Sequence, residues 1–384
     1  MNRHNGFTTL AVTLILVSIL VAVSAFIGKV LVSEKRITLN EIDYRVAMAA
    51  AEQGMAEAIA WLNVSDSVTT LPAGTVSTSS GTATYQVTIA EDVPINGVRE
   101  IVSTATLASG AQSRVSVQVA ESGVLNPNTS GPAAPLIISG TAPLNGNITI
   151  VANPNGSGKG VPVSVWSKDA VTIGGSALTC GLHEYKNGGC TTNNAYSHKQ
   201  GSSTVIRSDI VDNDPGFPSD MFDYVFGEPD SAAAWEKLNA KATAIVSSCT
   251  DPLLSGGAGF FIVEGAANCT FDTIGSSTAP VILLVKDSSV VMNASSKFYG
   301  ILFSYDSDPA AAPAYNIKVN GGAEFYGSLL ANHDSVTMAN GTFSFIYNED
   351  IICDLSACAS SGLGSGSSNP FISIDVIPGS WKDW

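Results

Sequence analysis

The N-terminal region is defined by an uncharged apolar run that follows a short polar leader. Residues 1–6 contain one firm positive charge, at Arg3, and residues 7–28 (FTTLAVTLILVSILVAVSAFIG) contain no charge. At about 1.5 Å per residue, this run is long enough to cross the roughly 30 Å hydrocarbon core of a bilayer as a helix. The pattern predicts a membrane-spanning helix that begins almost at the N-terminus.

The helix is expected to continue beyond the apolar run. Residues 29–63 lack proline and are rich in Ala, Glu, Met and Leu, which favour helix. Glu41 and Arg45 are spaced as an i, i+4 pair, and residues 47–62 offer small and apolar side chains for packing. We therefore predict one helix over residues 7–63.

Three interpretations of the leader compete. A cleaved signal peptide would be cut after Ala25, because small residues precede that position, and a plain signal anchor would keep Met1. In the third, a dedicated peptidase removes residues 1–6 by cutting between Gly6 and Phe7. The third is favoured because the apolar run exceeds the usual signal-peptide core and the helix continues after it.

Short alternating stretches after the helix predict a small β-meander over residues 64–125. The Ser/Thr-rich residues 65–80 read as a connector. Three stretches alternate between apolar and polar residues with Asn-Gly or Ser-Gly turns between them, at 82–90, 100–107 and 113–120. This pattern is typical of antiparallel strands.

A second body is expected at residues 136–384, after a Pro/Gly/Asn-rich linker at 126–135. It combines short apolar strands with Asn-Gly and Gly-Gly turns, and the triplet Phe-Tyr-Gly occurs at 298–300 and again at 325–327, with an approximate third copy at 339–345. Such a repeat suggests the coils of a β-solenoid (a β-helix-like body); a β-sandwich is the alternative. Residues 231–247 have helical composition and are expected to form an insertion capped by Ser231. The predicted fold class is α+β.

Six cysteines fall into three local pairs, which favours short disulfide loops in an oxidising compartment. The spacings do not match the C-x-x-C pairs of a structural zinc site. Six cysteines formally allow other pairings. The candidate disulfide residues are Cys180 and Cys190, Cys249 and Cys269, and Cys353 and Cys358.

The charge and motifs limit the chemistry that the chain is expected to perform. A net charge of -15 disfavours nucleic acid as a partner, because such binding depends on Lys and Arg. An enzyme on a β-rich scaffold would need paired carboxylates, yet proline and glycine interrupt the acidic residues between 209 and 223, as in a turn-rich loop. Asp212 and Asp214 are weak calcium candidates. We expect no enzymatic activity and no cofactor.

The order of these features resembles type IV pilins and, among them, the PilX-type minor pilin or pilus-assembly family. The resemblance rests on Gly6, Phe7, the apolar run, the helical stretch 49–55 (AAAEQGM) and the C-terminal residues 378–383 (PGSWKD). It implies that prepilin peptidase cuts after Gly6 and methylates Phe7. It also implies partnership with other pilins, an inner-membrane stage before the pilus surface, and a periplasmic or extracellular body.

One departure from the pilin pattern bears on the role of the subunit. Most pilins carry a glutamate at the fifth mature position, whereas counting from Phe7 places Ala11 there. In the pilin family, the subunits that lack this glutamate are associated with initiation or tip complexes, and the chain resembles them in this respect. The sequence therefore favours a structural minor pilin; an anchored adhesin with a surface ligand, or a surface carbohydrate-active enzyme, are the alternatives.

Overall fold

The chain divides into two compact units. Unit 1 consists of Met1–Leu62, Ser67–Ala120 and Ile374–Trp384, and unit 2 of Asn63–Asp66 and Glu121–Ser373. The structure is a computed structural model that describes residues 5–62, 71–79, 81–91, 98–129, 131–309, 315–334, 339–356 and 371–384. The C-terminal segment, expected with the second body, thus belongs to unit 1.

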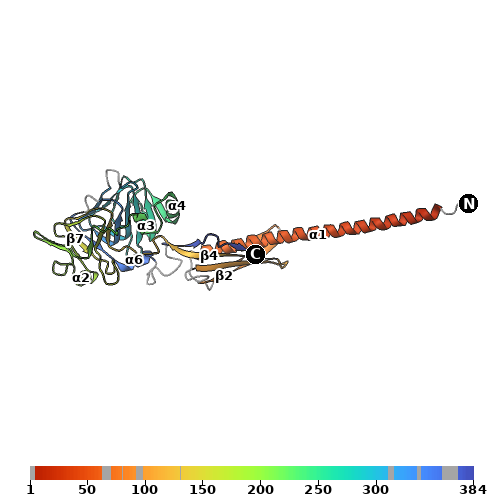
Figure 1. The fold of residues 1–384 in the computed structure, drawn as a ribbon, viewed down its shortest axis with the longest axis horizontal. Helices are drawn as coiled ribbons and strands as arrows, with labels where there is room; N and C mark the ends of the chain where they lie inside the picture. Colours follow the sequence, from red (N-terminus) through yellow and green to blue (C-terminus); the bar gives the residue numbers. More distant parts are fainter. Residues whose placement is uncertain are drawn as a thin grey trace. The chain divides into compact units, whose positions relative to one another are not determined.

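Unit 1 is built on one long helix, α1 (Asn5–Leu62), of 58 residues. Figure 1 shows its N-terminal part, in red, extending beyond the strands of the same unit. The predicted long apolar helix is confirmed, and its continuity through Leu62 follows from the absence of proline.

An antiparallel sheet packs on the C-terminal part of α1. Its strands are β1 (Ala73–Thr78), β2 (Gly81–Ala90), β3 (Val98–Leu107), β4 (Gln112–Gly123), β24 (Ile372–Val376) and β25 (Lys382–Asp383). The prediction of a connector over residues 65–80 was wrong where β1 lies. That strand has largely exposed side chains and is held by backbone pairing with β2, from Ala73↔Gln86 to Thr78↔Gly81, so it shows little apolar alternation.

Small residues let α1 approach the sheet closely. Ala47, Ala50, Ala51 and Ala58 are fully buried against the sheet's apolar face. Gly54 lies so close to it that a Cβ added there would meet Ser103 Oγ at 2.5 Å and Tyr85 Cδ2 at 2.6 Å. This contact explains why the helical sequence becomes alanine-rich after residue 46.

Most strands of unit 2 belong to two sets of parallel, hydrogen-bonded strands, which we call the first and second ladders. The first ladder contains β14 (Ala244–Val246), β15 (Gly259–Val263), β17 (Val281–Lys286), β19 (Lys297–Tyr305), β21 (Glu324–Ala331), β23 (Thr342–Ile346), β7 (Asn147–Val151) and β10 (Leu178–Cys180). The second contains β16 (Asn268–Phe271), β18 (Ser289–Met292), β20 (Ile317–Asn320) and β22 (Ala339–Asn340). From β15 to β23, consecutive strands alternate between the two ladders.

The sequence repeat corresponds to the register between neighbouring strands. β19 pairs with β21 so that Phe298 faces Phe325 and Gly300 faces Gly327, and the next strand places Phe345 beside Phe325. The rings of Phe298 and Phe325 stack with centroids 4.6 Å apart. Equivalent residues of the repeats therefore lie side by side on neighbouring strands.

β21 forks at its middle. Its first half pairs with β23, which continues to β7, while its second half pairs with β5 (Leu136–Ile138). β5 leads in turn to β8 (Val165–Ser167) and β13 (Ile210–Val211). Strands from the beginning of unit 2 are thus held by strands from its end.

The central strands of the first ladder, such as β15, β17 and β19, are largely buried on both faces. Phe298 and Leu302 point into a core that both ladders share, whereas Ile301 and Phe303 point into a second core covered by helices. Those helices are α3 (Met221–Phe226), α4 (Ala232–Lys241) and α6 (Glu349–Ser356). Burial on both faces accounts for continuous apolar runs such as residues 281–285.

The expected helical insertion is shorter than predicted. Ser231 Oγ accepts a hydrogen bond from Ala234 N and caps α4, as expected, but the helix ends at Lys241. Residues 244–246 form the edge strand β14 instead, because they pair in parallel with β15. Propensity over 231–247 did not reveal this tertiary pairing.

Residues 126–135, expected as a linker, pack within unit 2 in their described part. Asn126 Nδ2 donates to the Asp223 carbonyl at 3.1 Å, Ala133 N donates to the Tyr224 hydroxyl at 3.0 Å, and Ala134 is fully buried. Residues such as Pro, Gly and Asn are common both in turns that pack on a domain and in free linkers, so the composition of this segment could not distinguish a packed turn from a linker.

Unit 2 also contains shorter elements. These are β6 (Ala142–Leu144), β9 (Val171–Ile173), α2 (Leu182–Lys186), β11 (His198–Gln200), β12 (Ser203–Val205) and α5 (Leu253–Gly256). β6 pairs with β9, and β11 and β12 extend the first ladder beyond β10 as an antiparallel hairpin.

Candidate functional site

The N-terminal part of α1 exposes apolar side chains in every direction. Every residue from Leu10 to Glu41 is exposed, including Leu16, Leu20 and Phe26, which are each at least 59% exposed. A helix that is apolar on all sides requires an apolar surrounding, either lipid or other helices. By length and composition, α1 is able to cross a membrane.

From residue 10 on, where the structure describes side chains, the polar side chains of the apolar run are satisfied by the helix itself. Thr13 Oγ1 donates to the Leu10 carbonyl at 2.9 Å, Ser18 Oγ to the Ile15 carbonyl at 2.8 Å, and Ser24 Oγ to the Leu20 carbonyl at 2.8 Å. In lipid, an unsatisfied hydroxyl would be costly. These bonds let the run enter an apolar phase without such a cost.

The expected processing residues lie in the first turns of α1. The structure describes the backbone of Gly6 and Phe7 as helical and leaves their side chains undescribed. Ala11, which takes the place of the pilin glutamate, is exposed on the same helix. Cleavage after Gly6 remains a prediction.

The anchoring of α1 on its sheet includes a polar contact that the sequence did not reveal. The Tyr85 hydroxyl donates to Glu57, and Gln53 Nε2 donates to Glu57 Oε1 at 3.0 Å. Tyr85 is 4% exposed. Burial and the neighbouring Glu57 raise the pKa of Tyr85 to about 12, and the hydrogen bond from Tyr85 lowers the pKa of Glu57.

This contact predicts that unit 1 loses stability in alkali. Folding favours the protonated phenol, so the contribution of Tyr85 is complete below its ordinary pKa of 10.0 and is lost as the pH rises through about 12. We expect the Tm of the wild type to fall more steeply over this range than that of Tyr85→Phe, as measured by circular dichroism.

The comparison with Tyr85→Phe is needed because burial also raises the pKa of Tyr305 and Tyr326 in unit 2. A parallel fall of both Tm curves would contradict the role of Tyr85. At the acid end the sign is opposite: the contribution of Glu57 is present above its ordinary pKa of 4.5 and is lost as the pH falls.

Two of the three expected cysteine pairs form disulfides, each between cysteines that are consecutive in the sequence. Cys180 joins Cys190 and Cys249 joins Cys269, with Cα atoms 5.9 Å and 5.0 Å apart. Cys353 is also disulfide-bonded. Its expected partner, Cys358, lies outside the described residues. Such bonds persist in oxidising compartments.

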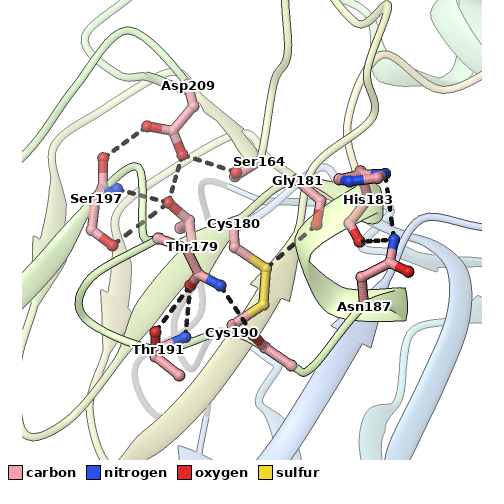
Figure 2. Close-up of a disulfide and its surroundings, with 12 residues drawn as sticks. Ser164, Thr179, Cys180, Gly181, His183, Asn187, Cys190, Thr191, Ser197 and Asp209 are labelled. Atoms are coloured by element: carbon pink, nitrogen blue, oxygen red, sulfur yellow. Dashed lines mark hydrogen bonds between the residues drawn. A yellow bond between two sulfur atoms is a disulfide. The ribbon is translucent and has the colours of Figure 1, made fainter.

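Asp209 is a buried carboxylate that is hydrogen-bonded to Thr179, the residue before Cys180 of the first disulfide (Figure 2). It is 2% exposed and accepts hydrogen bonds from Ser164 Oγ at 2.7 Å, Thr179 Oγ1 at 2.5 Å and Ser197 Oγ at 2.6 Å. The hydroxyls come from three separate segments, so the carboxylate ties them together. Sequence spacing placed Asp209 in an acidic loop and carried no sign of these partners.

The carboxylates of the two calcium candidates accept hydrogen bonds from other groups of unit 2. Asp212 Oδ2 accepts from Val171 N at 3.2 Å, and the two Asp214 oxygens accept from Trp166 Nε1 and Gly216 N, both at 2.8 Å. Across the part of the chain that the structure describes, no group of three or more His, Cys, Asp and Glu residues is arranged to hold a metal ion.

A hydroxyl and an imidazole form a buried pair in unit 2. Ser304 Oγ and His333 Nε2 are 2.9 Å apart, and His333 Nδ1 lies 2.8 Å from the Asp334 carbonyl. Burial lowers the pKa of His333. Nucleophilic chemistry requires access, and both side chains are only 1% exposed, so the pair fits a structural role better than a catalytic one.

Comparison with known proteins finds similarity among solved structures. No protein-family model and no curated protein sequence matches the chain. Among solved structures, it is similar to the competence-associated pilin ComZ from Thermus thermophilus, with 12% identity over 90% of this chain and 98% of that chain and a TM-score of 0.27. The functional assignment therefore rests on the chain's own helix and its contacts.

Proposed function

We propose that the protein is a minor, pilin-like structural subunit that acts in the assembly, initiation or tip of a type IV pilus. The observation that carries the proposal is the division of α1 into two parts. Residues 10–41 are exposed and mostly apolar, whereas the side chains that face the sheet of unit 1 are buried: Val46, Ala47, Ala50, Ala51 and Ala58.

This division suits a subunit that passes from a membrane into a helical filament core. A 58-residue helix is about 87 Å long, far more than the roughly 30 Å that a bilayer core requires. The apolar part is free to contact lipid first and the helices of neighbouring pilins afterwards, while the buried part holds unit 1. In this proposal the partners are other pilins, the inner membrane and prepilin peptidase.

Ala11 supports a minor rather than a repeated position. A carboxylate inside an apolar phase is costly unless it is paired, and such a pair would fix the stagger of neighbouring subunits. The exposed alanine at this position has no charge to pair. We propose that the subunit acts where that contact is not needed, as at the start of a filament.

We further propose that the two parallel ladders of unit 2 are two faces of a β-solenoid, in which each coil contributes one strand to each ladder. The alternation of strands between the ladders and the stacked phenylalanines support this. The role is structural rather than enzymatic, because Asp209 and the loop carboxylates Asp212 and Asp214 serve neighbouring hydroxyl, N–H and indole groups.

The mature N-terminus tests the proposal. We expect mass spectrometry of protein from peptidase-containing cells to find a methylated Phe7, and from peptidase-deficient cells an intact Met1. Gly6→Asp should block cleavage, because glycine lets a peptidase approach the backbone closely. Gly28→Ala, which changes a glycine of the same helix with no atom within 4 Å, should leave it unchanged.

Two other results would replace the proposal. A start at Phe26 would indicate a secreted β-protein, and Met1 retained in both strains would indicate a simple membrane anchor.

A further inference from the structure

Unit 2 contains an open groove whose size suits a small ligand. Its volume is about 710 Å³, within the usual range of small-molecule sites. Aromatic side chains lining it are Trp166, Tyr224 and Tyr347, and its polar side chains include Asn155, Glu349 and Asp350. No Lys, Arg or His is among the residues that line it.

The hydroxyl of Tyr347 has no hydrogen-bond partner within the part of the chain that the structure describes. The residue is only 4% exposed and lies against the groove. Its hydroxyl oxygen is not among the enclosed side-chain atoms that lack a partner, so it is open to the groove, where a bound molecule can pair with it. Burial and the nearby Glu349 raise the pKa of Tyr347, so the group stays a neutral phenol that both donates and accepts.

The other two rings are fixed in place by their own polar groups. Trp166 Nε1 donates to Asp214 Oδ2 at 2.8 Å, and the Tyr224 hydroxyl accepts from Ala133 N at 3.0 Å. The two rings meet edge to face, with centroids 5.6 Å apart. Rigid aromatic surfaces lower the entropic cost of binding.

The groove has the chemistry of a sugar site. The rings offer apolar faces for C–H groups, the carboxylates of Glu349 and Asp350 accept hydrogen bonds from hydroxyls, and the absence of lining cations disfavours an anion. We propose that this groove binds a neutral saccharide, whose hydroxyl pairs with Tyr347.

A cationic ligand fits less well. The carboxylates of Glu349 and Asp350 belong to exposed residues and remain solvated, whereas the unpaired polar group of the largely buried Tyr347 is a neutral hydroxyl. A desolvated cation needs a carboxylate at depth to offset the loss of its hydration. The inference concerns unit 2 alone and does not depend on the pilus proposal.

The test is titration calorimetry on the full chain in a polyoxyethylene detergent, so that no sugar head group competes. The probes are maltotriose, cellotriose and triacetylchitotriose. We expect at least one to bind the wild type and to bind Tyr347→Phe about tenfold more weakly, the effect of one lost hydrogen bond.

Tyr299→Phe is the control, because it removes the hydroxyl of a half-buried tyrosine of unit 2 that lies outside the groove. It should bind like the wild type. The proposal is overturned if none of the three sugars binds, if Tyr347→Phe binds as tightly as the wild type, or if tetramethylammonium binds and the sugars do not.

Discussion

Gly300→Ala is expected to destabilise unit 2 by about 4 kcal/mol or more, enough to prevent folding of many domains. Gly300 has a φ of +141°, and a Cβ built on it would lie 1.8 Å from the Val281 carbonyl oxygen. Val281 is its partner on the neighbouring strand, so the obstacle is backbone that cannot rotate away. The clash would force the two central strands of the first ladder apart.

Urea unfolding of the full chain, followed by circular dichroism, measures the effect. Gly188→Ala is the control, because Gly188 has a φ of +128° with no atom within 4 Å of its added Cβ. It should cost only the backbone strain, about 1–2 kcal/mol. Equal losses in the two variants would show that the strand contact at Gly300 does not matter.

Asp209→Ala is expected to destabilise unit 2 by about 3 kcal/mol, because it leaves three buried hydroxyls without their acceptor. Ser164, Thr179 and Ser197 all donate to this carboxylate, and the residue is 2% exposed. Water cannot replace the lost acceptor without entering the packed interior. The loss is measured as the free energy of unfolding in urea.

Two further variants test whether the loss of stability in Asp209→Ala comes from the buried carboxylate. Asp209→Asn keeps one oxygen and the size of the side chain, so it should lose less than Asp209→Ala. Asp212→Ala removes a less buried neighbour that accepts from Val171 N, and should cost about 1 kcal/mol. A loss at Asp209 no larger than at Asp212 would rule out the role of the buried carboxylate.

The features that the sequence predicts well are those repeated along one element. The long apolar helix follows from uninterrupted composition, and the Phe-Tyr-Gly copies correspond to the observed register of β19 and β21. The apolar run is continuous along the chain and the Phe-Tyr-Gly repeat is periodic, so both can be recognised in a single sequence.

The features that the sequence did not reveal depend on residues distant along the chain. β1 and β14 are edge strands that form by pairing with a neighbour, and their own residues show little strand pattern. The partners of Asp209 lie 12 to 45 positions away, and Tyr85 reaches Glu57 across 28 positions. Contacts between residues so far apart cannot be predicted from the spacing of residues in the sequence.

The fork in β21 constrains the order in which unit 2 is completed during folding. β5 and β7 need β21 and β23 as neighbours, and the Leu329↔Leu136 and Thr342↔Asn147 pairs join segments almost 200 positions apart. Contacts of such separation form late, because the intervening chain must be available first. When the chain emerges from its N-terminal side, the strands that emerge first stay unpaired until the last ones arrive. In that interval the fold itself does not protect their edges from wrong pairing.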